Sequence, residues 1–441
     1  MPKNIRTPKV VADPIYGIVD IRPVLPMVET PAFQALGDKR QLGMAYLTFP
    51  SATHTRKAHS LGAYHATREL ADRWIKLGFI KKREGDALAG YALYHDIGHP
   101  AFSHVTEPFC AMPAGIRGMS ANSALSLAVI REHKKEIKAC GIDFALLCAL
   151  ASHEHPLHVA VSDKNLGTEK LDYLERDGAV TILSRPPGLS YLREHIYFIN
   201  GKLAADEKVV DNAIEAQNFY LKMYKNVYLR KASVIAQRML QKMVHHLILA
   251  GEIAPDDLLQ LTDSELLGVI RLSKDHLVNT LYDLLKRRNL FREAIVVRPE
   301  RFMDIETKTE KGVAIFGAAE RTMARLINSP TFRVKNQSGL EAAEAEIAKI
   351  AGIPPKFVLI APIATPERFD ARDIMIYQDN AKKLVSLRKQ YPAHFKNLEE
   401  IAQSYLAFRV CTTEKYRKAL SAPRTARKIF KFLTAHATSA W

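Results

Sequence analysis

The sequence of 441 residues has no apolar run approaching the ~20 residues that a membrane span needs. It has four cysteines, none of them in a CxxC pair, and its first residues lack the apolar stretch of a secretory signal. It has no internal repeat and no low-complexity block. These absences argue against a membrane protein, a disulfide-stabilised secreted protein and a repeat protein. We expect a reduced, cytoplasmic protein with no membrane partner.

The composition that is present is that of a globular protein with excess positive charge. Hydrophobic residues make up 47% and charged residues 25% of the chain, and 441 residues exceed one typical core. Residues 381–441 hold thirteen Lys and Arg against three Glu, so this tail carries +10 of the net +16. A nucleic acid or another polyanion is one possible partner of this tail; a merely solubilising surface is the other interpretation.

Hydrophobic periodicity predicts a mainly α protein with a short N-terminal β-hairpin and a small mixed α+β C-terminal lobe. The Asp13-Pro14 turn begins the hairpin, and Pro186-Pro187-Gly188 interrupts the helices. We predict three parts: residues 1–185 as a helical core, 186–300 as a helical extension, and 301–441 as the C-terminal α+β lobe with its basic helical tail. The expected elements are helices from about Thr30 to Thr181, Asp206 to Ile248, Pro255 to Leu290 and Lys382 to Lys431, and strands within Phe357 to Pro362 and Asp373 to Tyr377.

His95 and Asp96 follow directly on an alanine-rich apolar run, where ionisable side chains are costly unless something neutralises them. A divalent metal would do so, and imidazole with carboxylate suits Mn, Fe, Zn, Ni or Co. His59, beside small and apolar neighbours upstream, is a candidate third ligand. Farther on, Glu169, Asp172 and Tyr173 share one helix face. A His-Asp pair also occurs at helix caps and on solvated faces, so the dipeptide alone leaves these alternatives open.

The order of several short motifs adds to this interpretation. They are Asp13-Pro14-Ile15-Tyr16-Gly17, Thr30-Pro31-Ala32-Phe33-Gln34, Gln41-Leu42-Gly43, Phe49 to Arg56, His59-Ser60-Leu61-Gly62, His95 to His104, and Leu171-Asp172-Tyr173 with Arg176-Asp177. In this order the sequence resembles the HD-domain dNTP triphosphohydrolases, a family that includes the vertebrate enzyme with a sterile-alpha-motif and an HD domain. Over residues 190–441 the resemblance is fainter.

The resemblance implies a divalent metal, of undetermined identity (Mn, Mg, Fe, Zn, Ni or Co), held by His59, His95, Asp96 and Glu169. The family normally has aspartate where this chain has Glu169. It implies further roles for named positions: Arg56 and Lys170 against substrate phosphates, Gln41, Leu42, Tyr173 and Asp177 against sugar and base, and His99, His104 and Glu107 in proton transfer. Such cations and near-neutral histidines suit phosphate chemistry.

The resemblance also implies regulation and assembly. Lys9, Val10 and Gln34 stand where the regulated vertebrate enzyme contacts an activator nucleotide, although Gly37 replaces an expected arginine. A homo-oligomer, dimer or tetramer, is expected. A further His-Glu pair of the family is missing, since no histidine occurs between His104 and His133.

The activity implied is metal-dependent hydrolysis of a dNTP to a deoxynucleoside and inorganic triphosphate. One alternative is an HD phosphodiesterase or nucleotidase acting on other nucleotides or on nucleic acid, in which His153 and His155 help to hold two metals. Another is a catalytically impaired HD protein that binds nucleotides or nucleic acid, the latter through residues 415–431.

Overall fold

The structure is a computed structural model that describes residues 9–114, 116, 118–305, 312–362 and 372–436. Contacts within the chain define two compact units, each built from discontinuous segments. Unit 1 contains the described parts of Met1–Met223, Asp256–Leu266 and Ala371–Phe395; unit 2 contains those of Tyr224–Pro255, Leu267–Asp370 and Lys396–Trp441. The three-part division at residues 185 and 300 stays a prediction.

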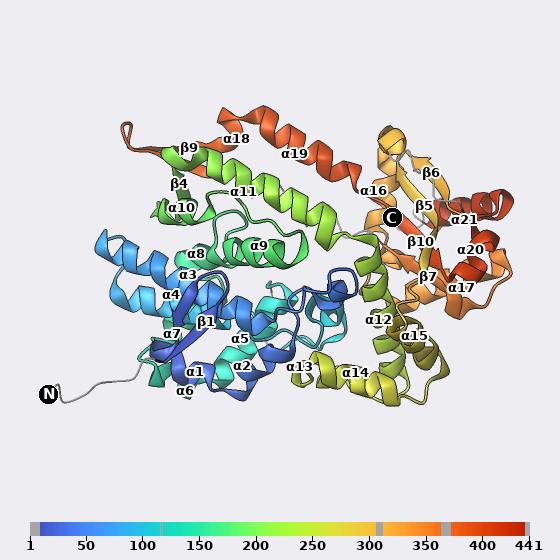
Figure 1. The fold of residues 1–441 in the computed structure, drawn as a ribbon, viewed down its shortest axis with the longest axis horizontal. Coiled ribbons are helices and arrows are strands. Elements are labelled where there is room, and N and C mark those ends of the chain that lie inside the picture. The colour runs from blue at the N-terminus through green and yellow to red at the C-terminus, as the bar shows by residue number, and fades with distance from the viewer. Residues whose placement is uncertain (1–8, 115, 117, 306–311, 363–371, 437–441) are drawn as a thin grey trace. The chain divides into compact units, whose positions relative to one another are not determined.

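Unit 1 is mainly helical, as predicted (Figure 1). Its helices are α1 (Leu25–Val28), α2 (Pro31–Ala35), α3 (Arg56–Lys76), α4 (Lys82–Tyr94), α5 (Ala121–Glu132), α6 (Lys134–Ala139), α7 (Phe144–Ala151), α8 (Val159–Ser162), α9 (Thr168–Thr181), α10 (Leu189–Glu194), α11 (Val210–Met223), α13 (Asp257–Gln260) and α18 (Leu387–Gln390). Two further helices, α14 (Asp263–Leu272) and α19 (Pro392–Ser404), contribute residues to both units.

The centre of unit 1 is α3, which packs against α4 and α9 (Figure 1). Thr55 begins α3 by accepting a hydrogen bond from the Ala58 N–H. Gly62 lets α9 approach closely, since a Cβ there would lie 2.0 Å from Asp172 Oδ1. Helix α4 buries Ala87, Ala89 and Ala92 and ends at Tyr94. The polar residues after Tyr94 therefore emerge in the interior of the unit, beside α3.

Two small sheets belong to unit 1. The predicted N-terminal hairpin is confirmed as β1 (Val10–Asp13) paired antiparallel with β2 (Gly17–Asp20). A four-stranded sheet has the order β3-β4-β8-β9, and its strands are β3 (Ile196–Ile199), β4 (Lys202–Asp206), β8 (Met375–Gln378) and β9 (Lys383–Ser386). Strands β4 and β8 are parallel, so a segment about 170 residues farther along the chain completes this sheet.

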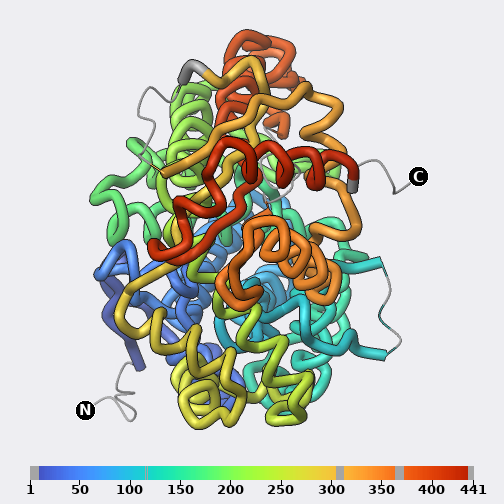
Figure 2. The backbone as a smooth tube through the Cα atoms, turned by 90° about the vertical axis from the view of Figure 1, so that its right-hand side faces the viewer, coloured from blue at the N-terminus to red at the C-terminus, as the bar shows by residue number. Residues whose placement is uncertain are grey.

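Unit 2 is a mixed lobe around a sheet of order β6-β5-β10-β7. The strands are β5 (Arg292–Pro299), β6 (Ala314–Ala318), β7 (Val358–Ala361) and β10 (Phe408–Thr412), and the helices are α12 (Lys231–Leu249), α15 (His276–Lys286), α16 (Glu320–Asn328), α17 (Gln337–Ala351), α20 (Glu414–Ser421) and α21 (Pro423–His436). Helices α17 and α21 contact each other, and Figure 2 shows them side by side in orange and red. Both contribute to one apolar core with β5, β7 and β10.

Two predictions about the C-terminal region are wrong. Lys382 to Lys431 is not continuous helix, because β9 and β10 interrupt it. The segment Asp373 to Tyr377 does form a strand, β8, but it pairs in the sheet of unit 1 and not with β7. Both errors concern strands whose partners lie far away in the sequence, and local hydrophobic patterns carry no information about such pairing. The mainly α fold class with a mixed C-terminal lobe is confirmed.

A histidine of unit 2 gives a prediction about stability and pH. His246 on α12 lies 3.3 Å from Glu341 Oε1 and 3.4 Å from Asp275 Oδ2. The hydrogen bond to Glu341 raises the pKa of His246, although burial opposes this. This stabilisation is therefore complete below the ordinary histidine pKa of about 6.5 and is lost as pH rises through the raised pKa.

As pH rises through the raised pKa of His246, the unfolding free energy of the wild-type protein should fall by up to about 1 kcal/mol more than that of His246→Gln. Denaturant unfolding at a series of pH values measures the difference. The control is His276→Gln on α15, whose side chain lies near Thr280 and Lys356. If the unfolding free energy of His246→Gln depends on pH as that of the wild type does, the ion pairs of His246 are not the source of that dependence.

Candidate metal centre and phosphate site

His59 and His95 point their Nε2 atoms at each other from neighbouring helices. The two atoms are 3.1 Å apart, and both side chains are buried. His95 Nδ1 lies 2.7 Å from the Ala92 carbonyl oxygen, and His59 Nδ1 lies 2.7 Å from Asp172 Oδ2. A carbonyl and an ionised carboxylate only accept hydrogen bonds. Each Nδ1 therefore carries a hydrogen, and the Nε2 atom of each ring is the one that faces the other ring.

Asp96 adds a carboxylate to this pair. Its Oδ2 lies 3.8 Å from His59 Nε2, and its Oδ1 lies 3.4 Å from His95 Nε2. Arg56 Nη1 donates to Asp96 Oδ2, and Arg56 Nε donates to Ser103 Oγ at 2.5 Å. Burial opposes ionisation of Asp96, but the neighbouring charge of Arg56 holds its pKa well below the usual range. Asp96 is therefore an anion at neutral pH.

These three side chains form what we call the metal-ligand cluster: His59, His95 and Asp96, whose ligand atoms all lie within 4.8 Å of one another. A divalent cation between the two facing Nε2 atoms would accept a lone pair from each ring, and the ionised Asp96 carboxylate stands beside them. Two nitrogens and one carboxylate oxygen suit a divalent transition metal. The donor set therefore fits the divalent metal that the sequence predicts. The prediction used only the motifs, whereas the fit rests on the positions of the three side chains.

Asp172, which sequence reasoning placed on the correct helix face without a role, orients the cluster. It is fully buried on α9 and accepts hydrogen bonds from His59 and from Arg176 Nε and Nη2, the latter two at 3.0 and 2.8 Å. Burial would raise its pKa, but Arg176 and His59 lower it to about 2. A carboxylate on the outer nitrogen of a metal-binding histidine fixes the tautomer and ring orientation. The i,i+4 spacing of Asp172 and Arg176 is the sequence signal for this pair.

A second group follows the cluster along the chain. His99, predicted to assist catalysis, is buried, and its Nε2 lies 3.2 Å from Asp96 Oδ1. Burial, with the charge of Arg56, lowers the pKa of His99 to about 3, so this ring is neutral at pH 7. His104 packs edge-on against His99, and His104 Nδ1 lies 2.7 Å from Glu107 Oε2. The predicted pairing of His104 with Glu107 is thus present, and more than half of the His104 side chain is exposed.

The turn that carries His104 is held from a distant segment. Phe102 and Ser103 both have positive φ (56° and 52°), a region that costs non-glycine residues on the order of 1 kcal/mol or more each. Asp263 holds the turn because its buried carboxylate accepts from the N–H groups of Phe102 at 2.6 Å and Arg40 at 2.9 Å. Sequence reasoning missed Asp263, because no local pattern connects it to residues 160 positions earlier.

The Lys39 ammonium group is buried behind His99. It donates to the His99 carbonyl at 2.7 Å and to the Leu259 carbonyl at 3.0 Å. Burial lowers the pKa of Lys39 to about 8. Lys39 therefore ties the backbone of the His95 to His99 segment to residues 256–266, in parallel with Asp263.

Glu169, the predicted fourth ligand, lies half-buried in the first turn of α9 and is not a member of the metal-ligand cluster. Its charge does reach the cluster, because it is among the groups that raise the pKa of His59 against the effect of burial. Its neighbour Lys170 is buried with Nζ 3.3 Å from the centre of the Tyr220 ring. Tyr173, one turn along, packs edge-on against His59 at 6.3 Å between ring centres.

His54 connects two of the residues that are predicted to contact sugar and base, Asp177 and Gln41. Asp177 Oδ1 lies 2.7 Å from His54 Nε2, and the His54 carbonyl accepts from the Gln41 N–H at 3.0 Å. Gln41 Oε1 is buried and has no hydrogen-bond partner among the described atoms. Leu42 is half-buried and precedes the turn of helix that begins at Gly43. A buried amide oxygen without a donor is suited to a ligand hydroxyl.

The other candidate positions lie apart from the cluster. Lys9 and Val10 are exposed on and beside β1, whereas Gln34 donates to the Val28 carbonyl at 2.7 Å and accepts from Lys57 at 2.6 Å. The His153 ring stacks on His158 with 4.2 Å between centres. His155 accepts from the Leu157 N–H. Within the described residues, neither His153 nor His155 joins a metal-ligand group.

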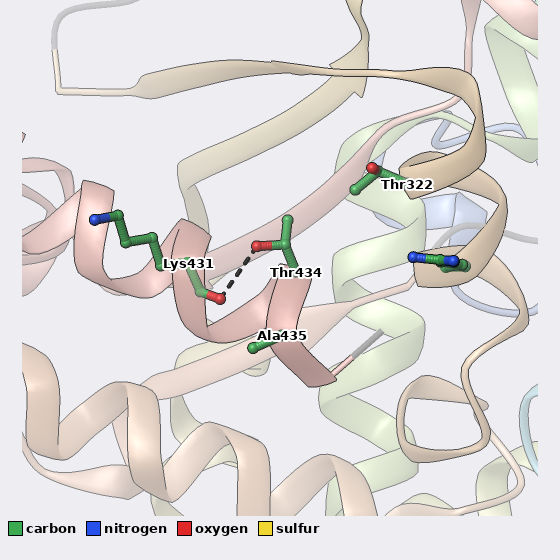
Figure 3. Close-up of a pocket in the computed structure, with 5 residues that line it drawn as sticks. Thr322, Lys431, Thr434 and Ala435 are labelled. Carbon is green, nitrogen blue, oxygen red and sulfur yellow. Dashed lines mark hydrogen bonds between the residues drawn. The ribbon is translucent and has the colours of Figure 1, made fainter. Parts of the chain in front are cut away.

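A hollow of about 330 Å³ lies in unit 2, and none of the predicted metal, catalytic or substrate-binding residues lines it. It is lined by Thr322, Arg325, Lys431, Thr434 and Ala435 of α16 and α21. Figure 3 shows the Lys431 side chain extending away from Thr434, whose hydroxyl donates to the Lys431 carbonyl at 3.1 Å. Two of its polar groups are thus satisfied within α21, and the hollow holds no cluster of catalytic side chains. The candidate chemistry lies in unit 1.

Comparisons with known proteins find similarity to HD-domain proteins. The family model described as HD associated region matches residues 190–334. An HD domain-containing protein of Acanthamoeba polyphaga mimivirus is 31% identical over 255 residues, 52% of this chain and 55% of that protein. The deoxynucleoside triphosphate triphosphohydrolase SAMHD1 of Bos taurus is 40% identical over 106 residues, 23% of this chain and 18% of that protein. The chain thus spans about half of the first relative and a smaller part of the second.

A solved structure shows the same fold. The crystal structure of a phosphohydrolase from Bacteroides thetaiotaomicron has a TM-score of 0.66, covers 92% of this chain and 100% of its own, and is 21% identical. This likeness is one of fold, and the buried His59, His95 and Asp96 lie in the helical part of that fold. With the matches above, the similarity to HD-domain proteins that the motifs indicate is confirmed. Among the described residues, no helix is both long and apolar enough to span a bilayer.

Proposed function

We propose that this protein is a metal-dependent dNTP triphosphohydrolase, which converts a dNTP to a deoxynucleoside and inorganic triphosphate. The observation that carries the proposal is the facing pair of His59 and His95 Nε2 atoms beside ionised Asp96, with Arg56 in contact and Lys170 on the neighbouring helix. The local identity to SAMHD1 of Bos taurus supports a deoxynucleotide substrate. Both the phosphohydrolase chemistry and the deoxynucleotide substrate are part of this proposal, and the similarity to HD-domain proteins supports the former.

His59, His95 and Asp96 would hold the metal, and Glu169, whose charge acts on His59, would be the fourth ligand. A divalent metal in this place supplies Lewis-acid polarisation of a phosphoryl oxygen and lowers the pKa of bound water. The chain itself supplies the Arg56 cation, and Lys170, whose pKa burial lowers to about 7, would be held protonated by the substrate phosphates. Together they would offset the charge that grows on the phosphate oxygens in the transition state.

Proton transfer falls to His104. Water attacks the α-phosphorus, the bond from phosphorus to the 5′ oxygen breaks, and that oxygen must gain a proton while the attacking water loses one. Glu107 lies on His104 Nδ1, which leaves Nε2 for this exchange, and His99 supports the ring from the side. Gln41, Leu42, Tyr173 and Asp177 would contact sugar and base. A second nucleotide at Lys9, Val10 and Gln34, a homo-oligomer and nucleic acid on the basic tail stay predictions.

The reaction is tested by incubating the purified protein with each dNTP and Mn²⁺ or Mg²⁺ and separating the products. We expect equal amounts of deoxynucleoside and triphosphate. In ¹⁸O-labelled water the label should enter triphosphate, because attack is at phosphorus. Release of phosphate or diphosphate with a nucleotide product would favour a different HD phosphohydrolase activity, and binding without any product would favour the non-catalytic alternative.

Glu169 is tested by two substitutions at the same position. If its carboxylate ligates, Glu169→Gln should weaken Mn²⁺ binding by roughly 10-fold or more, whereas Glu169→Asp should retain it, since aspartate is the family's usual residue. Titration calorimetry with Mn²⁺ measures both. The matched control is Glu175→Gln, because Glu175 lies on the same helix as Glu169. This variant removes a carboxylate that is paired with Arg193 of α10. Wild-type affinity in Glu169→Gln would remove Glu169 from the ligand set.

A further inference from the structure

The N-terminal hairpin is connected to the metal-ligand cluster by one buried line of charges. Asp13, the last residue of β1, accepts from Arg176 Nη1 at 2.8 Å through Oδ2. Arg176 donates a hydrogen bond to each oxygen of Asp172, and Asp172 Oδ2 accepts one from His59 Nδ1. Asp13, Arg176 and Asp172 are all at least nine-tenths buried. We propose that Asp13 is a positioning residue for the metal, acting through Arg176 and Asp172 on His59.

The reason is electrostatic. Arg176 lies directly on Asp172, so the two together have no net charge, and His59 would face a neutralised pair. Asp13 balances Arg176, and the three side chains then carry one net negative charge beside His59 Nδ1. That charge makes His59 Nε2 a better donor to a cation, which is the effect that a carboxylate behind a metal-binding histidine has in general. In a buried site such charges are little screened.

The turn of the hairpin does not require a carboxylate at this position. Asp13 Oδ1 accepts from the Ile15 N–H at 2.8 Å and the Tyr16 N–H at 3.1 Å, a turn that asparagine forms equally well. Val19 on β2 is fully buried and anchors the hairpin by apolar contact. Only Oδ2, the oxygen facing Arg176, distinguishes aspartate from asparagine. The negative charge of Asp13 is therefore explained by the line to His59 and not by the hairpin.

The inference rests on the proposed metal centre but not on the substrate, so it is tested by metal affinity. Mn²⁺ binding to the full chain is measured by calorimetry for wild type, Asp13→Asn and Asp172→Asn. We expect about tenfold weaker binding in Asp13→Asn and roughly 10–100-fold weaker binding in Asp172→Asn. The control is Asp20→Asn on the same hairpin, an exposed residue whose Oδ1 accepts from the Arg22 N–H; its affinity should equal that of wild type.

A rescue separates this electrostatic role from a structural one. Asp13→Asn combined with Arg176→Gln removes both outer charges and leaves Asp172 as the single negative charge beside His59. The double variant should bind Mn²⁺ more tightly than Asp13→Asn alone, whereas a role in packing predicts a further loss. The double variant also answers the question if Asp13→Asn alone does not fold, because it leaves no buried cation without a counter-charge.

The outcomes are distinct. Wild-type affinity in Asp13→Asn, or a double variant no tighter than the single one, overturns the inference and leaves the proposed function standing. A wild-type chain that binds Mn²⁺ but hydrolyses no dNTP overturns the proposed function, while the affinities still decide the inference. A wild-type chain that binds neither Mn²⁺ nor another divalent metal overturns both.

Discussion

Replacing Asp96 by asparagine should abolish the proposed dNTP hydrolysis to the limit of detection, a loss of at least about 100-fold, because it removes a proposed metal ligand and not only a supporting group. Asparagine keeps the volume and one oxygen but not the charge that offsets a divalent cation. It also leaves Arg56, which is buried against Asp96, without its counter-charge. Metal content measured after dialysis should fall together with turnover.

The control for Asp96→Asn is Asp86→Asn on α4. Asp86 is ion-paired with Arg68 and Lys82, but these pairs are partly exposed and contribute about 1 kcal/mol or less. Turnover and metal content should therefore stay at the wild-type level. Thermal melting of both variants separates loss of chemistry from loss of folding. Normal turnover with normal metal content in folded Asp96→Asn would place the catalytic centre elsewhere.

The residues of the centre that the sequence predicts correctly are those that lie close together in the chain. His95, Asp96 and His99 share one turn after a buried helix, and His104 with Glu107 follows three residues apart, so adjacency in the chain becomes adjacency in space. The hairpin and the main helices were predictable for the same reason, since turn residues and helical periodicity are short-range signals.

The remaining features depend on how closely distant segments approach. Glu169 and Asp172 lie one turn apart on the same face of α9, and the sequence assigns the metal to the first. Which of them reaches His59 depends on the contact of α9 with α3, and Asp172 is the one that does. Asp263 and β8 are similar cases, because each pairs with a segment about 160 to 170 residues away. No spacing or periodicity encodes such distances.

The same close approach of α3 and α9 makes Gly62 a sensitive glycine near the centre. Adding a Cβ would place it 2.0 Å from Asp172 Oδ1 and 2.3 Å from Arg176 Nη2. Both side chains are buried and hydrogen-bonded, so neither can swing into solvent. The helix would have to move away from α9, which draws His59 away from Asp172.

We therefore expect Gly62→Ala to destabilise the protein by about 1–3 kcal/mol or more, as overpacked cores do, although alanine favours helix by roughly 1 kcal/mol over glycine. Mn²⁺ affinity should fall as well, because His59 loses its orienting carboxylate. Denaturant unfolding and calorimetry measure the two effects.

Gly268→Ala is the matched comparison, with the opposite expected sign. Gly268 lies within α14, and a Cβ there meets no described atom within 4 Å. The same substitution should stabilise the protein by up to about 1 kcal/mol, since only the helix preference of alanine remains. If Gly62→Ala is as stable as Gly268→Ala and keeps its Mn²⁺ affinity, α3 and α9 do not meet at Gly62. In that case Asp172 does not orient His59 either, because the hydrogen bond between them needs the same close approach of α3 and α9.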